Sequence, residues 1–405
     1  MADIWLEANA HGSFYSAAIR CGPFWTSPTV GYIIYINSTY DLVYNKTVDG
    51  GANWAGQTNI KTAWVFSVDC WADWQTAGDA GTKIHIAYMN TTSDEVRYVY
   101  LDTNTDTVGG DDLIETCQGT GAMSANTSKL FTGISITKTR GGNIAVAFFY
   151  TDTGYARHYN FYTSPDADTW TNKTTPWEAV MDRILLFPGN EADNQDIWAA
   201  FWDISENELS LKTYDDSGNS WSEQLISGSM TEAFEYLNMD GAIRLSDGHF
   251  IFAAWNLFDL ATADLMVWDI NGAGSITAKT NILTDSAESA LVSILINQVN
   301  DDIYAAYVRG TAMNSLVKVF YQKSVDGGTN WGGETALQAN AEDDTKWVSS
   351  GAMKAAWGGK FMPYWFNDDE KDLVTSDDNS VSIPSSAVVR IPRPGVVNFQ
   401  DPAIV

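Results

Sequence analysis

The sequence is poor in positive charge and in long apolar runs, and each shortage excludes a class of partner. Only 23 Lys and Arg stand against 51 Asp and Glu, which gives a net charge of −28. Nucleic acids bind to clustered Lys and Arg, and no basic cluster is present, so we expect no nucleic-acid partner. No apolar run approaches the ~20 residues of a membrane helix, so we expect no membrane insertion.

Cysteine is scarce as well. The three cysteines, Cys21, Cys70 and Cys117, cannot all pair, and none belongs to a C-x-x-C motif. Their spacing therefore argues against a disulfide framework and against a zinc site, and we expect small buried side chains. The first residues lack the basic and apolar regions of a signal peptide. We expect an extracellular or virion-surface location, reached either with export information that lies outside this sequence or by another route such as virion assembly or lysis.

Aromatic residues are abundant, and they follow an internal repeat. The chain has 17 Trp, 18 Tyr and 17 Phe. Residues 30–54 and 302–331 share one pattern, in which an apolar stretch, a polar turn and a second stretch lead to Asp-Gly-Gly-x-Asn-Trp. The spacing of such tryptophans fits seven units of about 55 residues, and repeats of short strands at this period are typical of propeller blades.

These units predict the fold. Each holds four short strand candidates, and no helical periodicity extends over ten positions. We expect an all-β, seven-bladed β-propeller of four-stranded antiparallel blades, with residues 1–405 as a single domain and six blades as the alternative. Residues 6–11 resemble residues 337–342, so the N-terminus can supply the outer strand of the last blade. Residues 387–392 compete for that place, and both alternatives stay open.

Two segments carry a specific resemblance. Thr47–Trp54 and Ser324–Trp331 fit Ser/Thr-x-Asp-x-Gly-x-x-Trp and resemble the Asp boxes, or BNR repeats, of the sialidase-like propeller superfamily. The resemblance implies turns between the third and fourth strands of a blade, away from the active face. Asp would accept hydrogen bonds from turn amides, Gly would take unusual backbone angles and Trp would fill space between sheets. The predicted structural residues are Asp49, Gly51, Trp54, Asp166, Trp170, Asp215, Trp221, Asp326, Gly328 and Trp331.

One acidic segment has two interpretations. Asp102, Asn104 and Asp106 place oxygen atoms at alternate positions, as calcium ligands are placed. Leu113 stands where an EF-hand loop needs Glu, and the segment falls where a degenerate Asp box belongs. We interpret it as a box, with calcium as the alternative, and expect no other metal and no cofactor.

Ligands of propellers usually dock at one mouth of the channel. The loops there join the second and third strands of a blade or lead into the innermost strand, and in this chain they mix aromatic rings with carboxylates, which suits sugars. The predicted ligand-binding residues are Arg97, Arg157, His158, Trp177, Glu178, Glu235, Tyr236, Arg309 and Trp347. Asp182 and Asp240 begin the innermost strands of adjacent units and form a candidate catalytic pair, since two carboxylates are the minimum for glycoside hydrolysis. Repetition alone also explains them.

The sialidase resemblance implies three arginines that hold a substrate carboxylate, one of them in an Arg-Ile-Pro motif near the N-terminus. Arg390 has that motif near the C-terminus instead, and Arg20 has the expected place without the Pro. We therefore expect a glycan-recognising propeller, a surface or virion-associated module with a carbohydrate partner. A glycoside hydrolase with paired carboxylates and a protein-interaction scaffold are the alternatives, so whether the chain is an enzyme stays open.

Overall fold

The computed structural model describes most of the chain. It covers residues 3–7, 20–117, 133–151, 157–177, 183–190, 194–203, 206–228, 230, 239–259, 262–286, 289–310, 317–337, 345–349, 351–353, 359–367, 372–376 and 381–383. Within these ranges, no helix is long and apolar enough to cross a membrane.

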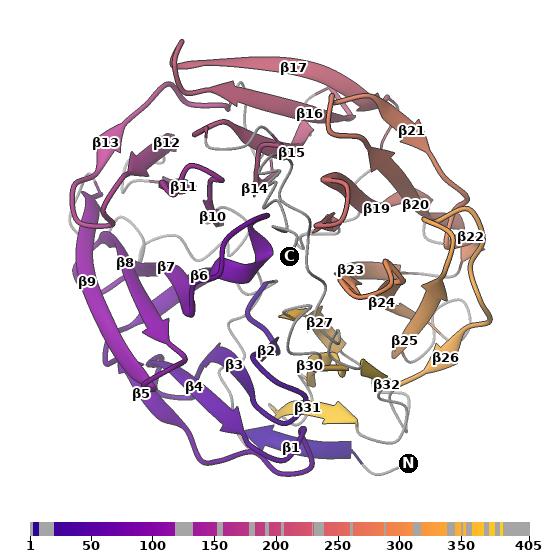
Figure 1. Ribbon diagram of the computed structural model, residues 1–405, viewed down its shortest axis with the longest axis horizontal. Coiled ribbons are helices and arrows are strands. Elements are labelled where there is room, and N and C mark those ends of the chain that lie inside the picture. The colour runs from indigo at the N-terminus through magenta and orange to yellow at the C-terminus, as the bar shows by residue number, and fades with distance from the viewer. Residues whose placement is uncertain are drawn as a thin grey trace, which may run out of the picture.

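The sheets stand around a common centre like the blades of a propeller (Figure 1). Five blades pair four strands antiparallel in chain order, and the first strand of each lies nearest the centre. The first two of these blades are β6 (Val65–Ala72), β7 (Lys83–Asn90), β8 (Glu95–Asp102) and β9 (Thr107–Thr116), and β10 (Gly133–Lys138), β11 (Ile144–Thr151), β12 (Arg157–Ser164) and β13 (Thr171–Asn172). The third and fourth are β14 (Arg183–Pro188), β15 (Ile197–Asp203), β16 (Glu208–Asp215) and β17 (Ser220–Ser227), and β18 (Met239–Arg244), β19 (His249–Asp259), β20 (Thr262–Ile270) and β21 (Ile276–Ala278). The fifth is β23 (Ser289–Ile296), β24 (Ile303–Gly310), β25 (Val317–Ser324) and β26 (Thr335–Ala336).

The sixth blade is closed by the N-terminal strand. Its path is β27 (Thr345–Ser349), β30 (Tyr364–Asn367), β31 (Asp372–Ser376) and β1 (Asp3–Glu7), all antiparallel. Asp3 pairs with Ser376, so the chain's beginning is the outer strand of this blade. Of the two alternatives for ring closure, the N-terminal one is seen, and residues 387–392 lie outside the described residues. Closure removes a sheet edge that would otherwise invite pairing with another chain.

A further sheet, which we call the junction sheet, lies in the ring between β1 and β6 and follows a different plan (Figure 1). It contains β2 (Phe24–Trp25), β3 (Gly31–Ile36), β4 (Leu42–Thr47) and β5 (Thr58–Lys61), and β28 (Ala352–Met353) pairs parallel with β2. Smaller elements are β22 (Leu283–Ser286) beside β20, the pair β29 (Gly359–Phe361) and β32 (Val381–Ile383), and the 3₁₀ turn η1 (Asp73–Gln75).

The prediction of seven four-stranded antiparallel blades is therefore wrong. Among the described residues six blades of that kind are seen, and the junction sheet has five strands with one parallel pair. The tryptophans recur once for each hairpin of a second and a third strand. The junction sheet also has such a hairpin, formed by β3 and β4, so the period includes it as a seventh unit. Its innermost strand is only two residues long, and the sequence period does not report on that strand.

The core lies between neighbouring sheets. Successive strand residues point to opposite faces, so a strand packed on both faces is apolar throughout. In β15, Trp198 and Ala200 pack toward the next blade, where they meet the cluster that contains Phe250. In β19, Ile251 and Ala253 face the blade after that. This stacking of whole sheets explains why the second strands are buried along almost their full length.

The Asp-box turns are built alike. In the first, the backbone N–H of Gly51 donates to Thr47 Oγ1 (2.9 Å) and that of Asn53 donates to Asp49 Oδ1 (2.9 Å). Ser324, Asp326, Gly328 and Asn330 repeat these bonds at the same lengths, and Gly51 and Gly328 have φ of 90° and 85°. The hydrogen bonds from Asn53 lower the pKa of Asp49 to about 2.

All four turns join the third and fourth strands of a sheet. Asp166 accepts from the backbone N–H of Thr169 (2.7 Å), and Asp215 accepts from that of Gly218 (3.1 Å). The indoles of Trp221 and Trp331 donate to the carbonyls of Thr174 (2.8 Å) and Thr280 (3.0 Å) on the preceding blade. These side chains hold turns and neighbouring blades together, and membership of the Asp-box superfamily stays a prediction.

Packing between blades predicts a large effect of Trp255→Ala. Trp255 is fully buried between β19 and the next blade, where its indole donates to the Leu291 carbonyl (3.0 Å) and its ring meets Tyr307 edge-on. We expect a loss of about 3–5 kcal/mol in the free energy of unfolding, measured by denaturant titration. Val48→Ala, at a side chain 67% exposed, is the control and should change stability by less than about 0.5 kcal/mol. Equal effects of the two substitutions would contradict this packing.

Candidate functional site

Several predicted site residues lie beyond the described part of the chain. Asp182, Glu178, Glu235 and Tyr236 are outside the described residues. Arg157 and Trp347 lie on β12 and β27, but the structure does not describe their side chains. Their proposed roles stay predictions, and the site is built here from the residues that the structure places.

The two described arginines of the predicted ligand face are held by carboxylates of their own sheets. Arg97 Nε donates to Glu95 (2.6 Å), and Nη1 donates to the Asp111 carbonyl (2.8 Å). Arg309 donates from Nε (2.8 Å) and Nη2 (2.5 Å) to the two oxygens of Glu334. The paired carboxylates offset the positive charge that either guanidinium would offer to an anionic ligand.

Two predicted aromatic residues lie against other rings. His158 stacks on Tyr150, with ring centres 4.8 Å apart. Trp177 is 7% exposed and packs on Phe149 and Tyr159. Trp177 therefore offers little ring surface to a ligand.

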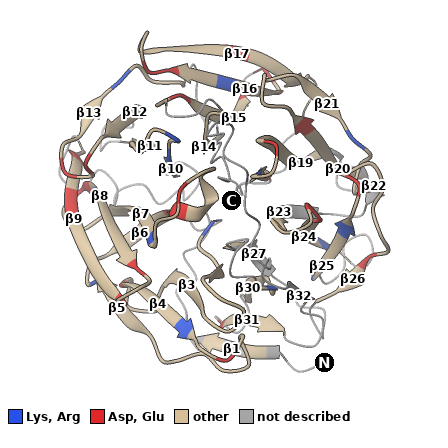
Figure 2. Ribbon diagram, viewed as in Figure 1, with Lys and Arg blue, Asp and Glu red and all other residues tan. Residues whose placement is uncertain are grey.

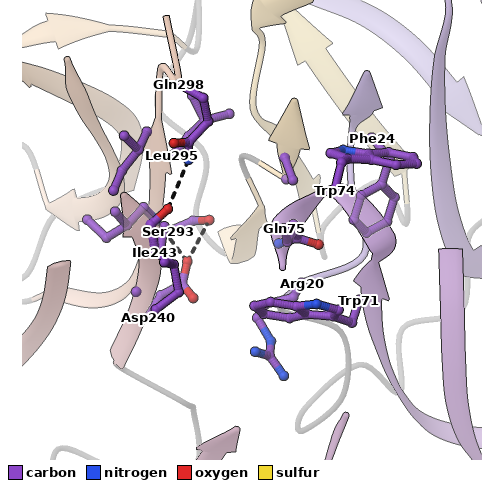
Figure 3. A pocket seen from close by; sticks show the side chains of 16 residues that line it. Arg20, Phe24, Trp71, Trp74, Gln75, Asp240, Ile243, Ser293, Leu295 and Gln298 are labelled. Atoms are coloured by element: carbon purple, nitrogen blue, oxygen red, sulfur yellow. Dashed lines mark hydrogen bonds between the residues drawn. The ribbon is translucent and has the colours of Figure 1, made fainter. Parts of the chain in front are cut away.

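The channel contains a small cavity. Figure 3 shows Asp240 and Ser293 on one wall and Arg20 and Trp71 on the other. Its volume is about 30 Å³, which is room for a water molecule or two and much less than a sugar ring occupies. A saccharide therefore does not fit within this cavity beside Asp240.

Asp240 has a buried carboxyl group, one oxygen of which accepts hydrogen bonds from the neighbouring strand. Oδ2 accepts from the backbone N–H of Ile294 (2.8 Å) and from Ser293 Oγ (3.1 Å), while Oδ1 has no hydrogen-bond partner among the described residues. Burial raises the pKa of Asp240 to about 6, against the opposing effects of the Ile294 N–H and of Arg20. With a pKa of about 6, a fraction of the Asp240 carboxyl stays protonated at neutral pH.

The register gives Asp240 a role in joining two innermost strands. Asp69 on β6 accepts from Ile136 N–H (2.8 Å), and Ser135 on β10 accepts from Leu186 N–H (2.9 Å), as Asp240 on β18 does from Ile294. Each joins an innermost strand to the next one. At this position β14 has Leu185, which pairs with Ala200 as Asp240 pairs with Ala253. The register therefore matches Asp240 with Leu185, and the proposed pairing with Asp182 stays a prediction.

Arg20 ties three innermost strands together. It pairs with Asp69 on β6, donates to Ser135 Oγ (2.8 Å) on β10 and donates to the Leu186 carbonyl (2.7 Å) on β14. Its guanidinium lies 5.3 and 5.2 Å from the ring centres of Trp71 and Phe187. Arg20 is 5% exposed and has a structural task, so it is not placed to bind a substrate carboxylate.

An aromatic pair with one exposed ring, which sequence reasoning missed, lies on the predicted ligand face. Tyr40 is in the turn between β3 and β4, and Trp64 is in the loop that enters β6. The rings are 4.7 Å apart at 32°, and Trp64 is 54% exposed. We call this pair the Tyr40–Trp64 platform. The sequence signal was a tryptophan directly before an innermost strand, away from the Asp-box position.

The backbone around the platform fixes its position. Val65 N–H donates to the Tyr40 carbonyl (3.0 Å), and Thr91 N–H donates to the Trp64 carbonyl (2.8 Å). Tyr40 has a φ of 68°, an unfavourable conformation for an aromatic residue and one that the surrounding structure must hold. The turns on either side, residues 37–41 and 91–94, are rich in hydroxyl, amide and carboxylate groups.

The proposed calcium residues have other partners. Asp106 accepts from Tyr32 Oη (2.6 Å) and from Lys46 Nζ (2.6 Å), and Asp102 accepts from the Asn104 N–H (2.9 Å). In the part of the chain that the structure describes, no three His, Cys, Asp or Glu residues are grouped so that they could hold a metal ion.

A polar cluster lies in a cleft of about 310 Å³ beside an Asp-box turn. His85 lies between Tyr98 (2.6 Å) and Asp73 (2.8 Å), and Lys138 Nζ donates to the same Asp73 oxygen (2.5 Å). Burial opposes ionisation of Asp73, but the bonds from His85 and Lys138 outweigh it and hold its pKa well below the usual range. His85 and Tyr98 are almost fully buried, so the cluster connects β7, β8 and β10.

No family model matches the chain, and no curated protein matches its sequence. Solved structures resemble its fold. An ulvan lyase of polysaccharide lyase family PL25, bound to -[GlcA(1-4)Rha3S]-, aligns with a TM-score of 0.60 at 10% identity over 92% of this chain and 95% of that one. A Hadza microbial sialidase aligns with a TM-score of 0.46 at 12% identity over 92% and 68%. The likeness to the lyase shows the β-propeller fold.

The raised pKa of Asp240 predicts how stability depends on pH. Folding disfavours the charged form of Asp240. The contribution of Asp240 to the free energy of unfolding is therefore fully present below about pH 4. It is lost as the pH rises to about 6, by up to about 3 kcal/mol. Asp240→Asn keeps an oxygen acceptor without the charge. We expect the variant to gain stability over wild type at pH 8 and to show no such gain at pH 4, by denaturant titration.

The exposed Asp168→Asn is the matched control for this charge change and should alter stability little at either pH. A variant Asp240→Asn that is destabilised more at pH 8 than at pH 4 would contradict burial as the cause of the shift.

Proposed function

We propose that this chain is a glycan-recognising β-propeller and that the Tyr40–Trp64 platform binds the sugar. The observation that carries the proposal is an indole 54% exposed, supported by a second ring, on the face where propeller loops meet ligands. The face of an aromatic ring is electron-rich, and the C–H groups on one side of a pyranose ring complement it. The neighbouring turns supply polar groups for the hydroxyls.

The charge around the platform favours a neutral sugar. Two arginines of this face, Arg97 and Arg309, are already paired with carboxylates. Asp and Glu are spread over sheets around the ring (Figure 2), and the net charge of −28 repels anions at long range. The negative charge of the whole chain disfavours a uronate, sulfate or sialic acid at long range and does not act on a neutral hexose.

The structural neighbours support a carbohydrate ligand in general terms. The ulvan lyase with this fold is a polysaccharide lyase bound to the saccharide -[GlcA(1-4)Rha3S]-. Its acidic substrate differs from the neutral sugar proposed here, and fold likeness alone does not carry a substrate from one propeller to another. Membership of the sialidase-like superfamily and an extracellular or virion-surface location stay predictions.

A glycoside hydrolase that uses Asp240 is the second candidate. Its support is the raised pKa of Asp240 together with the uncommitted oxygen, which are properties of a general acid. The cavity of about 30 Å³ and the structural role of Asp240 between strands favour the binding proposal.

Removal of the exposed indole tests the proposal. A glycan array that contains neutral and acidic saccharides should show binding to a neutral class, and Trp64→Ala should weaken that binding by about tenfold or more. Leu225→Ala is the control, because Leu225 is similarly exposed (53%) on β17 at the outer edge of another blade. Isothermal titration calorimetry, which does not rely on the Trp64 indole as reporter, gives the dissociation constants.

Three other results of the array would each reject a different part of the proposal. A blank array would reject glycan recognition, and neutral-glycan binding that Trp64→Ala leaves unchanged would reject the platform as its site. Binding to acidic glycans alone, lost in Trp64→Ala, would keep the platform and reject the neutral class.

A further inference from the structure

Two consecutive residue pairs join the segment before β2 to β6. Arg20 pairs with Asp69, and the next residue in each segment forms a second contact, between Cys21 Sγ and Cys70 Sγ at 3.5 Å. Both sulfurs belong to side chains with 0% exposure, in the same core cluster. The two cysteines are 49 residues apart along the chain, so sequence spacing gave no sign of the contact.

The backbone on each side holds the sulfurs together. The Cys21 carbonyl accepts from Ile34 N–H (2.9 Å) on β3, and Cys70 pairs with Ile86 within β6 and β7. A thiol is a weak hydrogen-bond donor, so a thiol pair gains little from its S–H group in the core. A disulfide bond is about 2.05 Å long, and an approach of about 1.5 Å would bring the two sulfurs to that distance.

We propose that Cys21 and Cys70 form a disulfide that fastens the Arg20 segment to the innermost strand β6. The oxidant is a small-molecule disulfide. One cysteine thiolate attacks it, which gives a mixed disulfide and one released thiolate. The second cysteine then attacks the protein sulfur of the mixed disulfide and releases the other small thiol. Two protein thiols and one small disulfide thus become one protein disulfide and two small thiols.

Burial sets when the exchange takes place. In the folded chain, burial raises the pKa of the Cys70 thiol and keeps reagents away, so the reactive thiolate is scarce. The bond therefore forms before the innermost strands close over the pair, and it resists reductants afterwards. Cys117 follows β9 and belongs to another core cluster, so it stays a free thiol.

The test is refolding of the full chain from denaturant in a mixture of reduced and oxidised glutathione. After the small thiols are removed, we expect one reactive thiol per chain in denaturant, and an intact mass two hydrogens below that of the reduced protein. Digestion with trypsin should give a linked pair of peptides, residues 21–46 and residues 62–83, that separates on reduction. The oxidised protein should melt at a higher temperature than the protein refolded with reductant.

Single cysteine variants are the controls. Cys117→Ser should leave no reactive thiol, whereas Cys21→Ser and Cys70→Ser should each leave two. The peptide linkage in the wild type decides the question even if one of these variants does not fold. Three reactive thiols after refolding in glutathione, or a linkage that includes residues 98–129, which contain Cys117, would overturn the proposal.

Discussion

The buried ion pair between Arg20 and Asp69 is the contact on which the centre of this propeller depends. The Arg20 guanidinium contacts three innermost strands, β6, β10 and β14, and lies near the rings of Trp71 and Phe187. Loss of Arg20 would leave a carboxylate buried without its counter-charge, which is costly in a core. Asp69, Ser135 and Asp240 extend the same arrangement, since each accepts an N–H from the next innermost strand. Side chains thus join the innermost strands that the structure describes around the channel.

The structural contacts and the proposed binding platform belong to different kinds of loop. The Asp-box turns join the third and fourth strands and hold the blades to one another, as the indole of Trp331 does through the Thr280 carbonyl. Tyr40 and Trp64 belong to the other kinds of loop, those that join the second and third strands or enter an innermost strand. A ligand bound on these loops need not enter the channel.

Local patterns in the sequence predict local structure well. The hairpins, the box turns and the N-terminal closing strand follow from apolar stretches, Asp-Gly-Gly turns and the likeness of residues 6–11 to residues 337–342. The number of regular blades could not be read in this way, because β2 is too short to leave a pattern and its parallel partner β28 lies far along the chain. The same limit applies to side-chain roles. Asp240 has the residue type of a catalytic acid, yet its register position is that of a strand-to-strand link.

The measurement that tests recognition on the platform most directly is a crystal structure of the protein with a neutral oligosaccharide. We predict that a pyranose ring lies against the exposed face of Trp64, with its hydroxyls bonded to the turns of residues 37–41 and 91–94. A saccharide bound in the channel against Asp240, with Trp64 free of contact, would contradict recognition at the platform and would favour chemistry at the channel instead.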